Sequence, residues 1–102
     1  MKKTIKAHLG SMYGLGPDDV EDLYQLGVQT VRDCLRVLDA EYARDMASFA
    51  ESMHTLKGAL FNMGLEGLGN QARVLELAGK NGEAGLIRAA YPAFRDAVRA
   101  IR

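Results

Sequence analysis

Apolar residues recur at spacings of three and four along most of this chain, a pattern typical of amphipathic α-helices. The clearest stripe consists of Met46, Phe49, Met53, Leu56, Leu60 and Met63. Asp45 precedes this stripe as a candidate N-cap, and Gly64 follows it as a candidate C-cap. The pattern therefore predicts a helix over 46–63 that buries one side against a core.

Similar stripes predict a long helix before this segment and two helices after it. The first begins at Pro17 with an acidic first turn, runs to near Tyr42, and carries Val20, Tyr24, Gly27, Val31, Cys34 and Leu38. The next ends at the turn 80–82 and carries Leu68, Ala72, Leu75 and Gly79. The last covers about 83–101 and carries Ile87, Ala90, Phe94, Ala97 and Ile101. Pro92 removes one backbone hydrogen bond, so we expect a kink or a split near Tyr91.

Ile5, Leu9 and Met12 predict a further short helix over about 3–13, which glycines 14 and 16 end. Short connections make successive helices antiparallel neighbours. We therefore expect an all-α fold in one domain, 1–102. Its main part is an antiparallel up-down four-helix bundle over 17–101, and the N-terminal segment 1–16 places a short helix across one end.

Composition narrows the class of function. The 102 residues are 48% hydrophobic and carry a formal net charge of zero, which argues against a general nucleic-acid binder. No apolar run is long enough to span a bilayer, and no hydrophobic signal-peptide segment follows the N-terminal lysines. The single cysteine, Cys34, fits a reducing compartment, so we expect a cytoplasmic protein that contacts neither membrane nor nucleic acid.

The candidate chemistry lies on the 46–63 helix, one position from its apolar stripe. Lys57, Gly58 and Phe61 follow His54 at three, four and seven residues, so the four share one face. A glycine inside a helix costs about 1 kcal/mol relative to alanine, and here it removes a side chain that would crowd the imidazole. An accessible, largely neutral imidazole beside a cation is what a phosphoryl-accepting histidine requires.

The run His54-Thr55-Leu56-Lys57-Gly58, followed by Gly64, resembles the histidine-containing phosphotransfer (HPt) family of two-component phosphorelays. The resemblance implies that His54 carries the phosphoryl group, Lys57 stabilises its charge, Gly58 keeps the approach open and Gly64 makes the turn after the helix. Phe61 is then a candidate contact for a partner. The implied partners are response-regulator receiver domains or a sensor histidine kinase.

The same resemblance implies no cofactor on this chain, since Mg²⁺ belongs to the receiver domain. Two other functions stay open at this stage. The first is that the chain is the phosphorylatable histidine domain of a chemotaxis-type kinase. The second is that it is a non-phosphorylated adaptor that binds receiver domains. It has no glycine-rich nucleotide-binding segment, so it is not an autonomous kinase. We expect no metal site, because no Asp, Glu, Cys or second His follows His54 at three or four residues.

Overall fold

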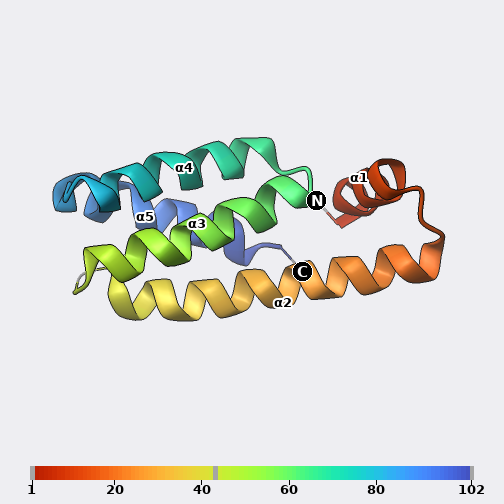
Figure 1. Ribbon diagram of the computed structural model, residues 1–102, viewed down its shortest axis with the longest axis horizontal. Helices are drawn as coiled ribbons and strands as arrows, with labels where there is room; N and C mark the ends of the chain where they lie inside the picture. The colour runs from red at the N-terminus through yellow and green to blue at the C-terminus, as the bar shows by residue number, and fades with distance from the viewer. Residues whose placement is uncertain (1, 43, 102) are drawn as a thin grey trace.

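The computed structural model describes residues 2–42 and 44–101, which form five α-helices and no strand (Figure 1). The helices are α1 (Lys2–Tyr13), α2 (Pro17–Glu41), α3 (Met46–Asn62), α4 (Glu66–Lys80) and α5 (Ala84–Arg99). The predicted all-α class is confirmed, and each predicted helix is present within a few residues of its expected ends.

Local signals set the helix ends as the sequence predicts. Pro17 opens α2, and acidic residues fill its first turn. The Asp45 carboxylate accepts hydrogen bonds from the backbone N–H groups of Ala47 and Ser48, so it caps α3. Hydrogen bonds from Ser48 and Ala47 also lower the pKa of Asp45. Gly64 ends the segment after α3 with φ +78°, a left-handed conformation that favours glycine.

The helices pack in sequence order around one core. α3 packs against both α2 and α4, and α4 packs in turn against α5 (Figure 1). The largest fully buried side chains come from all five helices: Tyr24, Tyr91, Phe49, Ile5, Leu38, Met53, Leu56, Leu60, Leu75, Ile87, Val31 and Val98. This packing places the middle of α3 beside the middle of α4, where the candidate site lies.

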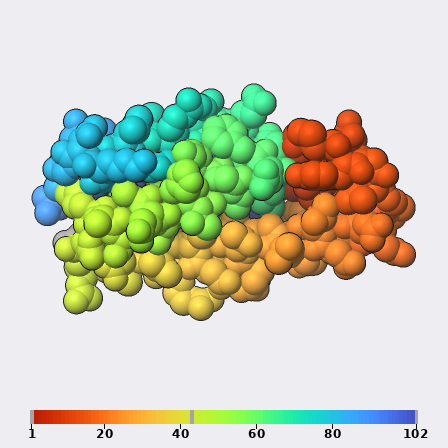
Figure 2. All heavy atoms as spheres, viewed as in Figure 1, coloured from red at the N-terminus to blue at the C-terminus, as the bar shows by residue number. Residues whose placement is uncertain are grey.

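α1 lies on the N-terminal part of α2 and forms a block at one end of the molecule (Figure 2). Ile5 and Leu9 bury its apolar side. The His8 ring packs onto Gly64 so closely that a Cβ atom at Gly64 would lie 2.6 Å from His8 Cγ. Gly64 is therefore required both for its backbone conformation and for the docking of α1.

α5 runs from Ala84 to Arg99 as one helix although Pro92 lies inside it, so of the two expected outcomes, a kink or a split near Tyr91, the split does not occur. Its buried stripe is Ile87, Tyr91, Phe94 and Val98, so the prediction of Ala97 as a core position was wrong. Ile101 is also buried, just after the end of the helix. The larger side chains take the core, and the Tyr91 ring packs against Tyr42 and Phe49 with centroids 4.9 and 5.6 Å away. Such tertiary contacts outweigh the helix penalty of one proline.

None of the helices in the described part of the chain is both long and apolar enough to cross a membrane.

Candidate functional site

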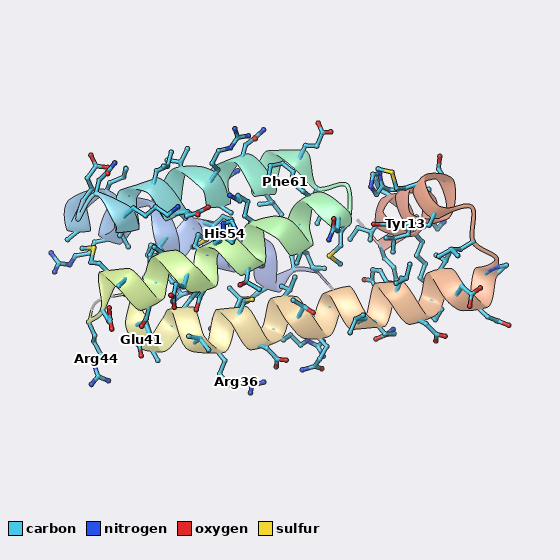
Figure 3. The ribbon with its side chains drawn as sticks, in the orientation of Figure 1. Tyr13, Arg36, Glu41, Arg44, His54 and Phe61 are labelled. Carbon is cyan, nitrogen blue, oxygen red and sulfur yellow. The ribbon has the colours of Figure 1, made fainter. Side chains whose placement is uncertain are left out.

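His54 stands at the seam between α3 and α4 (Figure 3). Its side chain is 66% exposed, yet the ring is not free to turn. The Nδ1 atom lies 2.9 Å from Oε2 of Glu76, a residue of α4 that is 22 positions away in sequence. One edge of the imidazole is thus held by the neighbouring helix, and the rest faces solvent.

Glu76 is the buried centre of this site. It is only 3% exposed, although it carries a carboxylate. Burial raises its pKa, but contacts from Lys57, Lys80 and His54 outweigh burial and lower the pKa to about 2. Glu76 is therefore ionised near neutral pH, and an ionised carboxylate can only accept hydrogen bonds. His54 Nδ1 must donate, which leaves Nε2 of the neutral ring as the free nucleophilic nitrogen.

Two lysine ammonium groups also contact the Glu76 carboxylate. The Lys57 ammonium lies 2.7 Å from Oε1, and the Lys80 ammonium lies 3.0 Å from Oε2. Lys57 comes from α3, one turn after His54, and Lys80 comes from the last turn of α4. Two cations and an imidazole N–H surround the buried carboxylate, which explains how a charge is tolerated in this position.

The other predicted site residues lie on the same seam or next to it. A Cβ atom at Gly58 would meet no atom within 4 Å, so the glycine borders open space on this helix. Phe61 is half-buried, with its ring against Gly69 and the Arg73 guanidinium 5.9 Å from the ring centroid. It thus belongs to the same α3–α4 seam as His54 (Figure 3).

His54 also separates two open hollows, and it lines both. The larger, of about 1000 Å³, runs between α3 and α4 and includes Glu51, Glu76 and Lys80. The smaller, of about 430 Å³, lies between α1, α2 and α3, and its other lining residues are Leu9, Tyr13, Leu23, Leu26, Gly27, Thr30, Thr55, Gly58, Ala59, Asn62 and Met63. The second hollow has no Asp, Glu, Lys or Arg in its lining, so it offers an uncharged surface beside the imidazole.

The sequence reasoning missed Glu76, Lys80 and Tyr13. Glu76 gave one signal, because it is a charged residue inside the apolar stripe formed by Ala72, Leu75 and Gly79. Tyr13, which is 50% exposed, lies on α1 and joins the site only through the packing of that helix. Across residues 2–42 and 44–101, no three His, Cys, Asp or Glu side chains gather as a metal site would require.

Comparison with known proteins shows the family of this chain. The family model described as the Hpt domain matches residues 22–102, which is most of the chain and includes α3, α4 and α5. No curated protein and no solved structure matches the chain. With the family model covering this much of the sequence, the chain belongs to the Hpt domain family, whose members serve histidine phosphotransfer in two-component signalling.

Proposed function

We propose that this protein is a phosphorelay carrier in which Nε2 of His54 accepts a phosphoryl group and passes it on. The donor is either a kinase or a receiver domain that carries an aspartyl phosphate. The acceptor is the aspartate of another receiver domain. The observation that carries the proposal is the Nδ1 contact with Glu76, which directs the opposite nitrogen of the ring into solvent.

The transfer step follows from that orientation. The Nε2 lone pair attacks phosphorus, an N–P bond forms, and the P–O bond to the receiver aspartate breaks. The aspartate leaves with the bonding electron pair as a carboxylate. Positive charge develops on the imidazole during this step, and the hydrogen bond from Nδ1 to ionised Glu76 stabilises it. The receiver domain supplies Mg²⁺, so this chain contributes positioning and charge.

The docking surface in this proposal adjoins His54 on the side of the smaller hollow. A receiver domain that reaches Nε2 must cover the neighbouring surface, where Tyr13 and Leu26 are largely exposed. Gly58 in the same hollow keeps the approach open. Phe61, on the α3–α4 seam, remains a proposed partner contact, because its side chain is only half-buried.

The same proposal includes the architecture and the compartment. We interpret α2–α5 as an antiparallel up-down four-helix bundle that carries α1 at one end (Figure 1). Cys34, the single cysteine of the chain, is a buried thiol, which fits the reducing cytoplasm.

The test is phosphorylation by a charged receiver domain, followed by intact-mass analysis of wild type, His54→Gln and His8→Gln. The chain has two histidines, so His8→Gln is the matched control. We expect an acid-labile, base-stable phosphate on wild type and on the His8 variant, and none on the His54 variant. A receiver domain that binds wild type without transferring phosphate would overturn the carrier function in favour of an adaptor.

A further inference from the structure

The two lysines at Glu76 do not have equivalent positions. Lys57 contacts Oε1, which no other side chain in the described structure is seen to contact. Lys80 contacts Oε2, the oxygen that also accepts from His54 Nδ1. The Lys80 ammonium and the imidazole are therefore joined through one atom, and no more than two hydrogen-bond lengths separate them.

The lysines also differ in how firmly they are held. The Lys57 side chain is 22% exposed, whereas the Lys80 side chain is 57% exposed. If Lys57 moved away, a buried carboxylate oxygen would lose its cation, which is costly. The Lys80 ammonium is largely in solvent, which screens its pair with Glu76, so Lys80 can exchange its partner more easily than Lys57.

Phosphorylation changes the competition for Oε2. A phosphoryl group on Nε2 brings about two negative charges to the solvent side of the ring. The imidazole becomes positively charged when Nε2 is phosphorylated. It then holds its hydrogen bond to Oε2 of Glu76 more strongly, because hydrogen bonds between ionised groups are stronger than neutral ones. Lys80 lines the same hollow as His54 and has a long flexible stem, so the phosphoryl oxygens lie within its range.

We propose that Lys80 is the ammonium group that binds the phosphoryl group on His54, while Lys57 stays with Glu76 and keeps the imidazole oriented. The inference rests on His54 being the phosphorylated residue. It assigns charge stabilisation to α4, in contrast to the sequence-based expectation for Lys57. The two lysines thus have different tasks: Lys57 keeps the imidazole oriented through Glu76, and Lys80 binds the phosphoryl group.

The direct test uses phosphoramidate, a small reagent that phosphorylates histidine without any protein partner. The ammonium resonances of ¹⁵N-labelled protein are recorded before and after reaction, and Lys57→Arg and Lys80→Arg assign the two signals. We expect the Lys80 signal to shift and sharpen on phosphorylation, while the Lys57 signal changes little. A shift of Lys57 alone, or of neither lysine, would overturn the assignment.

A second readout is the equilibrium of phosphoryl exchange with a receiver domain. Lys80→Ala should move this equilibrium toward the phosphorylated receiver on the order of tenfold, because a charge-assisted bond is lost. Lys80→Arg should restore it, and Lys3→Ala, which removes an exposed lysine of α1, should leave it unchanged. A wild-type equilibrium in Lys80→Ala would refute the proposal. Failure of every receiver to exchange phosphate would instead refute the relay function, and the phosphoramidate spectra would still decide the role of Lys80.

Discussion

At the scale of single residues, the site depends on a carboxylate in an apolar position. Glu76 lies in the buried stripe of α4, where most residues contribute only packing. Three donors from two helices keep it ionised, and it in turn fixes the tautomer of His54. Because the same contacts serve folding and chemistry, the protonation of Glu76 should be visible in stability as well as in phosphotransfer.

Acid should therefore remove part of the stability through Glu76. Its folded-state pKa of about 2 lies below the value of about 4.3 for an unfolded glutamate. The stabilisation is fully present above about pH 5 and is lost as the pH falls toward 2, with a size of up to about 3 kcal/mol. Urea unfolding at pH 7 and pH 3 should show a smaller loss for Glu76→Gln than for wild type. Glu51→Gln, which alters an exposed carboxylate of α3, is the control, and equal losses for wild type and Glu76→Gln would contradict the prediction.

At the scale of elements, the turn between α3 and α4 connects the site to α1. Gly64 has a left-handed backbone, and the His8 ring occupies the space that a Cβ atom would need. The turn thus brings α4 back along α3, which places Glu76 beside His54, and it also receives the N-terminal helix. One glycine meets both requirements.

Gly64→Ala should destabilise the protein by more than the backbone penalty alone. An alanine with a left-handed backbone costs about 1–2 kcal/mol, and here the His8 ring must also move. Gly82→Ala is the matched control, since its φ is +69° and a Cβ atom there would meet nothing within 4 Å. Urea unfolding should rank Gly64→Ala below Gly82→Ala in stability. If the two variants lose the same free energy, the contact with His8 contributes nothing.

At the scale of the whole molecule, a polar cluster connects the C-terminal helix to α2. The Tyr91 hydroxyl donates to Oδ1 of Asp39 at 2.7 Å, and Arg99 donates to Oδ2 at 2.7 Å. Burial raises the pKa of Tyr91, and the hydrogen bond to Asp39 raises it further, so the hydroxyl keeps its proton throughout the ordinary pH range. The cluster links Asp39 of α2 to two residues of α5 that lie 52 and 60 positions later in the sequence, so it holds the last helix against α2.

Tyr91→Phe keeps the aromatic packing but removes this donor. We expect a loss of about 1–3 kcal/mol in the free energy of unfolding, the size typical of a hydrogen bond to a charged group. The rate of phosphoryl transfer should stay at the wild-type value, because Tyr91 and Asp39 line neither hollow beside His54. Tyr13→Phe, at an exposed position, controls for the loss of a hydroxyl in the unfolding measurement alone, because Tyr13 lies on the proposed docking surface. A slower transfer in Tyr91→Phe would show that this cluster is coupled to the site.

Local sequence patterns were sufficient to predict the helices and the motif on α3. Helix periodicity, the Asp45 cap and the spacing of His54, Lys57 and Gly58 are local features, because residues three and four apart lie on one face of a helix whatever surrounds it. Local patterns were less reliable in α5, where Tyr91 and Val98 proved to be buried and Ala97 exposed.

The groups that surround His54 depend on how the helices pack against one another. Glu76 contacts the imidazole, and brings Lys80 close to it, because α4 packs antiparallel to α3 in one register. Tyr13 lines a hollow beside His54 because α1 docks beside the turn at Gly64. Periodicity states which side of a helix is buried, but it contains no information on which residue of another helix lies opposite. The register between helices depends on how side chains fit, and that fit places a buried charge against the exposed histidine.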